Sequence, residues 1–77
     1  MKADYKAIQR KIVREPACIK SDLIECAMRT EIVDGEVIYY LKFKDKREFR
    51  AIYSSRLVGE TLLGEPVIIT KEEYERY

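Results

Sequence analysis

The dipeptide Asp34-Gly35 constrains this chain more than any other feature, because it separates two runs of alternating apolar and polar residues. Asp-Gly at such a position favours a type I′ turn, since both central residues of that turn need positive φ. A two-residue loop also fixes the register of the strands that it joins, and here it places Met28 opposite Leu41. We therefore predict an antiparallel hairpin centred on Asp34-Gly35.

The first arm of this hairpin, residues 23–33, fits a helix or a strand by its own pattern. As a helix it would use Asp22 as its N-cap and bury one apolar side. As a strand it would pair with the following run so that four uncharged pairs share one face: Cys26 with Phe43, Met28 with Leu41, Thr30 with Tyr39 and Ile32 with Val37. A slip of one residue would turn every side chain to the other face, so this agreement favours the strand.

Residues 48–54 alternate in the same way and predict a third strand. A three-residue loop at 45–47 would pair Lys44 with Glu48 and Phe43 with Phe49. The same register places Lys42 opposite Arg50, which is a repulsive pair. One face of this meander is uniform and is the predicted core wall: Cys26, Met28, Thr30, Ile32, Val37, Tyr39, Leu41, Phe43, Phe49, Ala51 and Tyr53.

The remaining segments predict shorter elements around the meander. Pro16 should end the first helix, Gly64 should close the second, and Thr70 with Glu73 has the form of a capping box. In chain order we expect a helix at 3–14, a connector at 17–21, a helix at 56–63, a strand at 67–69 that Pro66 introduces, and a terminal helix or turn from Thr70.

The predicted fold class is α+β, in one small domain that spans residues 1–77. It comprises a three-stranded antiparallel meander, a short fourth strand and an N-terminal helix packed on one face. Hydrophobic residues make up 47% of the chain, which is enough for one core. As an alternative, strongly bent strands would close into a small SH3-like or Sm-like barrel.

The residue types exclude several kinds of chemistry. The chain has no His, and Cys18 and Cys26 cannot by themselves fill a tetrahedral zinc site. The three glycines stand apart, so no Gly-rich phosphate loop is present. We therefore predict a protein that is not an enzyme, with no catalytic residue, metal or cofactor. Without a signal-like N-terminus or a long apolar stretch, we expect a cytoplasmic protein with reduced thiols and no membrane contact.

The second face of the meander combines aromatic, aliphatic and basic side chains. Aromatic residues and Arg are enriched in protein interfaces, whereas Lys and Glu are depleted there. This mixture predicts a regulatory or interaction module that binds a protein partner or forms a homo-oligomer such as a dimer. The predicted partner-binding residues are Arg29, Ile38, Tyr40, Lys42, Arg50 and Ile52.

The same face permits two alternatives. Basic residues beside an aromatic ring can hold phosphates while a base stacks, so Tyr40 would stack in a nucleic-acid-binding module whose phosphate contacts are Lys42, Lys44, Lys46, Arg47 and Arg50. The net charge of only +1 counts against this function, since dedicated nucleic-acid binders are commonly basic. In the other alternative, the C-terminal segment with Tyr74 covers Ile38, Tyr40 and Ile52 as a second, smaller core.

Overall fold

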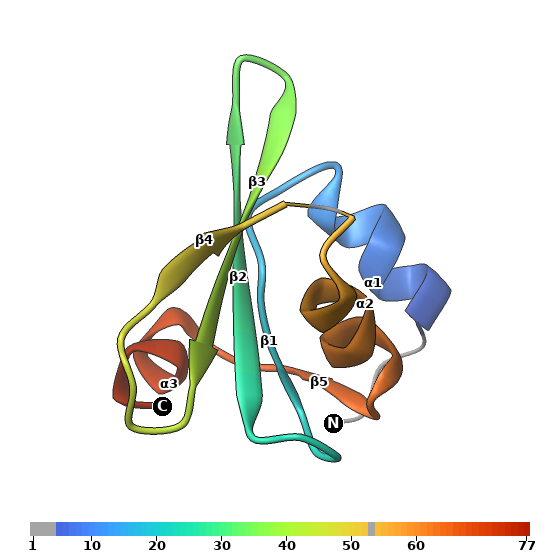
Figure 1. Ribbon diagram of the computed structural model, residues 1–77. Coiled ribbons are helices and arrows are strands. Elements are labelled where there is room, and N and C mark those ends of the chain that lie inside the picture. The colour runs from blue at the N-terminus through green and yellow to red at the C-terminus, as the bar shows by residue number, and fades with distance from the viewer. Residues whose placement is uncertain (1–4, 53) are drawn as a thin grey trace.

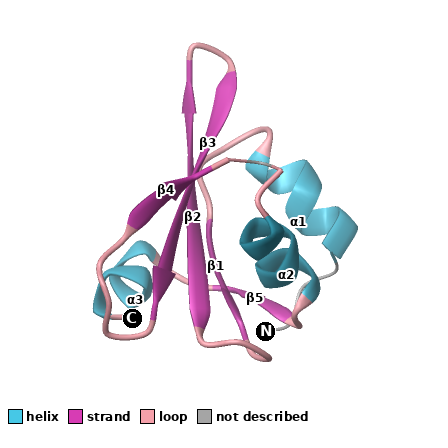
Figure 2. Ribbon diagram, viewed as in Figure 1, coloured by secondary structure: helices cyan, strands magenta, loops and turns pink. Residues whose placement is uncertain are grey.

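The computed structural model describes residues 5–52 and 54–77 and has an α+β architecture. Its strands form one open antiparallel sheet in the order β4-β3-β2-β1-β5. Helices α1 and α2 lie on one face of the sheet and α3 lies on the other (Figures 1 and 2). In chain order the elements are α1 (Tyr5–Ile12), β1 (Cys18–Ser21), β2 (Cys26–Val33), β3 (Glu36–Phe43), β4 (Phe49–Ala51), α2 (Arg56–Leu63), β5 (Pro66–Ile68) and α3 (Lys71–Arg76).

The hairpin of β2 and β3 confirms the prediction made from Asp34-Gly35. Asp34 has a φ of 50° and Gly35 a φ of 80°, as a type I′ turn requires. The register is the predicted one along the whole pair, from Val33 opposite Glu36 to Cys26 opposite Phe43. The strand interpretation therefore holds for residues 26–33, and residues 23–25 precede the strand.

The predicted connector at 17–21 is wrong, because Cys18–Ser21 forms β1, an interior strand of the sheet. It pairs with β2 on one side and with β5 on the other. A strand of four residues has too few side chains to show a clear alternation, and no turn dipeptide marks its ends. The addition of β1 makes the sheet five-stranded, where a meander with one extra strand was expected.

Closure into an SH3-like or Sm-like barrel is also wrong. The sheet ends at β4 and β5, which lie at opposite edges of the strand order and do not pair with each other. Both edge strands have three residues, so neither offers the long, bent ladder that a barrel closes with. The sheet is instead covered by helices on its two faces (Figure 2).

The pairing of β3 with β4 differs from the predicted register by two residues. Leu41 lies opposite Phe49 and Tyr39 opposite Ala51. The intervening loop is longer than expected and includes Asp45 with a φ of 60°. Because the shift is even, each side chain keeps its predicted face. Tyr53, the last residue of the predicted core wall, lies outside the described residues.

The first core lies between the sheet and helices α1 and α2. Ile8 and Ile12 of α1 are one helical turn apart and are almost completely buried. They join Val58 and Leu62 of α2 against Met28 and other sheet residues. At the end of the predicted core wall, Phe43 and Phe49 stack with ring centroids 6.0 Å apart but remain about two-fifths exposed.

A smaller second core lies under α3 on the other face. Tyr74 is buried there with Ala27 and Ile69. The helix begins as predicted, because the Thr70 hydroxyl accepts a hydrogen bond from the Glu73 N–H and the Glu73 carboxylate accepts one from the Thr70 N–H. The C-terminal segment therefore does pack on the second face, over the β1 and β2 end of it.

Candidate functional site

The second face divides into a covered part and an uncovered part. Side chains alternate along a strand, so the register of β2, β3 and β4 places Arg29, Tyr40 and Arg50 side by side on this face. Helix α3 covers the neighbouring region around Ala27, where Tyr74 is buried. The remaining surface continues along β3 and β4, away from α3.

We use the name open strip for the four residues Ile38, Tyr40, Arg50 and Ile52. Ile38 and Tyr40 are half-buried on β3, whereas Arg50 is exposed opposite Tyr40 on β4. Ile52 comes directly after β4, and 68% of its surface is exposed. These are four of the six predicted partner-binding residues, and the structure brings Tyr40 and Arg50 together as direct strand partners.

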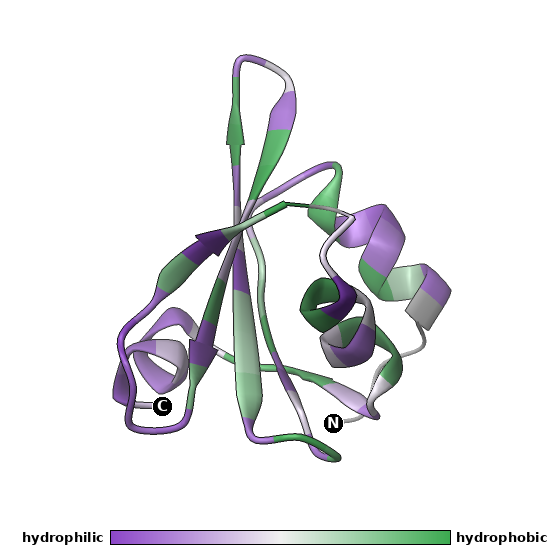
Figure 3. Ribbon diagram, in the orientation of Figure 1, coloured by the Kyte–Doolittle hydropathy of each residue, from purple (hydrophilic) through white to green (hydrophobic). Residues whose placement is uncertain are grey.

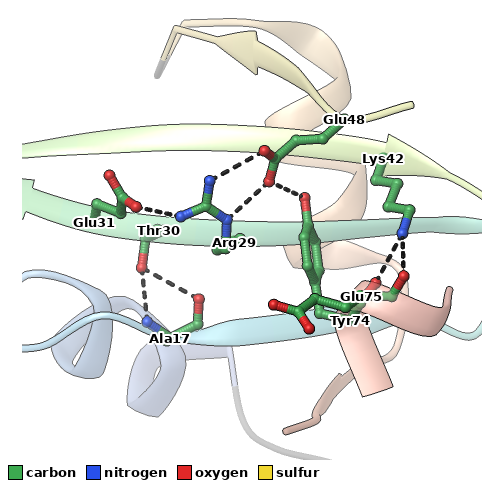
Figure 4. Close-up of polar contacts among 8 residues, drawn as sticks. All are labelled: Ala17, Arg29, Thr30, Glu31, Lys42, Glu48, Tyr74 and Glu75. Carbon is green, nitrogen blue, oxygen red and sulfur yellow. Dashed lines mark hydrogen bonds and ion pairs between the residues drawn. The ribbon is translucent and has the colours of Figure 1, made fainter. Parts of the chain in front are cut away.

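Arg29, a fifth predicted partner-binding residue, is engaged within its own chain. Its Nε and Nη2 donate to Glu48 Oε1 and Oε2 at 2.8 and 3.1 Å, and its Nη1 donates to Glu31 (Figure 4). The guanidinium also lies over the Tyr40 ring, 4.2 Å from its centroid. The hydrogen bonds that Arg29 donates to Glu48 and Glu31 raise its pKa. Arg29 therefore positions Tyr40 and is not a free anchor for a partner.

Glu48 joins the loop after β3 to the helix on the second face. Its Oε1 accepts a hydrogen bond from the Tyr74 hydroxyl at 2.7 Å, in addition to the bonds from Arg29 (Figure 4). The Arg29 hydrogen bond is the main cause that lowers the pKa of Glu48. Burial, followed by the Glu48 carboxylate, raises the pKa of Tyr74 far above its ordinary value. This network explains the shifted β4 register, because Glu48 faces Arg29 and not Lys44 as predicted.

Lys42, the sixth predicted partner-binding residue, reaches the last turn of α3. Its Nζ donates to the carbonyl oxygens of Tyr74 and Glu75 at 3.1 and 2.8 Å (Figure 4). A cation at a helix C-terminus satisfies carbonyl groups that have no partner within the helix. Lys42 therefore fastens α3 to the sheet, a role that sequence reasoning missed because the two segments are far apart in the chain.

A basic pocket of about 770 Å³ lies between the loop after β3 and helix α3. Its cationic side chains come from three segments: Arg29 and Lys42 from the sheet, Lys46 and Arg47 from the loop, and Lys71 from α3. Three of the five residues predicted to contact nucleic acid thus share one pocket. The other two, Lys44 and Arg50, are exposed and do not line it.

The hairpin of β2 and β3 extends beyond the rest of the sheet (Figure 1). A second pocket, of about 590 Å³, lies beside it and is lined in part by residues 29–33 of β2. Hydrophobic residues occur on both strands of this projecting part, and hydrophilic ones at its turn (Figure 3). The ladder with β1 stops at Arg29, followed by one further bond from the Thr30 N–H to the Ala17 oxygen. The pairing of Val33 with Glu36 across a two-residue turn directs the backbone groups of Ile32 away from β3, toward this pocket.

The two thiols are not arranged for nucleophilic chemistry. Cys26 is completely buried in the first core. Cys18 is partly buried against the second core, and desolvation raises its pKa. A reactive cysteine needs the opposite shift, because the thiolate is the nucleophile.

Comparisons with models of known protein families, with curated protein sequences and with solved structures find no match to this chain. Among the helices of the described residues, none has the length and apolar character needed to cross a membrane.

Proposed function

We propose that this protein is a small, non-enzymatic interaction module that associates with a second copy of itself through the open strip. The principal support is that α3 covers only one end of the second face. An isoleucine that is 68% exposed, an arginine and a half-buried tyrosine remain beside one another. Tyrosine and arginine are enriched where proteins meet.

The charges on this face favour a second copy as the partner. Glu36 lies on the same face as Ile38, while Arg50 lies on the neighbouring strand. A contact related by a two-fold axis uses the same patch on both copies, so a cation of one copy can meet an acidic residue of the other. The net charge of +1 adds little repulsion between two copies.

The test is the concentration dependence of the molecular mass in sedimentation equilibrium, compared between two matched variants. Ile52→Glu places a charge in the open strip and should weaken self-association by at least about tenfold, since a buried unpaired charge is costly. Leu63→Glu is the control, because Leu63 is 67% exposed on α2, on the other side of the sheet. It should leave self-association unchanged.

Two results would contradict the proposal. One is a wild-type protein that stays monomeric at millimolar concentration. The other is a dimer that tolerates Ile52→Glu but is disrupted by Leu63→Glu, which would place the contact on the helical side. Circular dichroism of both variants establishes that neither change acts by unfolding the chain.

Nucleic-acid binding is the weaker candidate. The Arg29 guanidinium already lies over the Tyr40 ring, so one face of the ring on which a base would stack is occupied. The predicted phosphate contacts are also divided, since Lys44 and Arg50 do not line the basic pocket.

A further inference from the structure

The lining of the basic pocket has more cationic than anionic side chains. Two of its carboxylates, Glu31 and Glu48, are bound to Arg29. Within residues 5–52 and 54–77, Lys46, Arg47 and Lys71 form no ion pair. The five cationic side chains of the lining outnumber its three carboxylates, Glu31, Glu48 and Glu75, so the pocket has a surplus of two positive charges.

These cations converge because of the fold and not because of their order in the chain. Lys46 and Arg47 lie on the loop after β3, and the Asp45 N–H at the start of that loop donates to the Tyr77 oxygen at 2.8 Å. This bond holds the loop beside α3, on which Lys71 is the first residue. Like charges that a fold brings together repel each other unless an anion offsets them.

The walls of the pocket are held in place by hydrogen bonds. Arg29, Glu48 and Tyr74 form one connected network, and Lys42 is fixed by the two carbonyl oxygens of α3 (Figure 4). A site whose walls are already ordered loses little conformational entropy when a ligand binds. The pocket volume of about 770 Å³ is also in the range of small-molecule sites.

We propose that the basic pocket binds the phosphate group of an anionic ligand, with Lys46, Arg47 and Lys71 as the contacting residues. Arg47 can offer a planar pair of N–H donors to two phosphate oxygens, and the two lysines add point charges. This site is separate from the open strip, so it does not depend on self-association.

The binding test uses the full chain at low ionic strength and two probes, inorganic pyrophosphate and a short oligothymidylate, titrated by calorimetry. If pyrophosphate binds tightly and the oligonucleotide binds no more tightly than pyrophosphate, the natural ligand is a compact phosphate compound. Tighter binding of the oligonucleotide, with affinity that falls steeply with salt, identifies a nucleic-acid strand. Absence of heat and of chemical-shift changes with both probes would overturn the proposal.

Three variants locate the site. The double variant Lys46→Gln/Arg47→Gln should weaken binding of the probe by at least about tenfold, since it removes two charge-assisted contacts. The double variant Lys6→Gln/Arg10→Gln removes the same charge from the exposed side of α1 and should change affinity much less. Glu75→Gln removes a pocket carboxylate and should tighten binding. Equal weakening by both double variants would show nonspecific charge attraction and contradict a defined site.

Discussion

At the scale of single residues, the Ser21 side chain joins the segment that follows β1 to the C-terminal end of α2. The Ser21 hydroxyl donates to the Gly64 oxygen at 2.6 Å and accepts hydrogen bonds from the N–H groups of Leu23 and Ile24. A Cβ on Gly64 would lie 2.4 Å from this hydroxyl and 2.8 Å from the Glu60 oxygen. Gly64 is therefore required for space, since its φ of −89° is open to any residue.

Gly59, which lies within α2, and Gly64, which follows its last residue, give a matched test. We predict that Gly64→Ala lowers the free energy of unfolding by about 1–3 kcal/mol, because the new methyl group overlaps the backbone and Ser21. Gly59→Ala should instead raise it by about 0.5–1 kcal/mol, because Gly59 lies within the helix. Apart from the helix's own backbone, a Cβ there meets no atom of the described residues within 4 Å. Urea denaturation measures both, and equal effects of the two substitutions would contradict the steric explanation.

At the scale of elements, the network of Arg29, Glu48 and Tyr74 joins β2, the start of β4 and α3. None of these contacts is local in the chain, so the network sets how the elements fit together after each has formed. The Arg29 side chain is 19% exposed and that of Glu48 32%, which limits screening by solvent. We expect the position of α3 to depend on this ion pair.

The network should make stability depend on pH. The pKa of Glu48 is lowered in the folded state, so its contribution is complete above the ordinary value of 4.5 and is lost as the pH falls through the folded pKa. We predict that Glu48→Gln destabilises the protein by about 1–2 kcal/mol at pH 7. The difference from the wild type should shrink as the solution is acidified below pH 4.5.

Chemical denaturation at several pH values measures this difference, with Glu25→Gln as the control. Glu25 is exposed and forms no ion pair within the described part of the chain. A constant difference between the wild type and Glu48→Gln at every pH would show that the carboxylate charge is not what stabilises the contact.

The difference between local contacts and contacts between distant residues explains which features the sequence could predict. The Asp34-Gly35 turn determined the hairpin and its register because turn chemistry is local. Helix α2 was predicted with its bounds, since Gly64 marks its end. The register of β4 was missed because Glu48 binds Arg29, which is distant in the chain. That same contact engages Arg29, one of the predicted partner-binding residues, within its own chain. Strand β1 was missed because four residues carry too little pattern.

At the scale of the whole molecule, one sheet separates two cores of different size. The larger core lies under α1 and α2, and the smaller lies under α3. Strand β2 contributes to both, with Met28 in the first and Ala27 in the second. Because each core is built on the same strand, we expect the chain to unfold as one cooperative unit.

Matched substitutions in the two cores test this expectation. Ile19→Val in the first core and Ile69→Val in the second should each lower the free energy of unfolding by about 0.5–1.5 kcal/mol. In both variants, near- and far-ultraviolet circular dichroism should report a single coincident transition. A separate, earlier transition in Ile69→Val would show that α3 and its core unfold independently.

The projecting part of the β2–β3 hairpin also bears on solubility. Exposed strand edges are templates for the edge-to-edge growth that leads to fibres, and natural proteins guard such edges with charge. Asp34 and Glu36 stand at the tip and Glu31 on the second face close behind it, so copies that approach tip to tip bring like charges together. These acidic residues would favour assemblies that stop at a finite size over filaments that continue to grow.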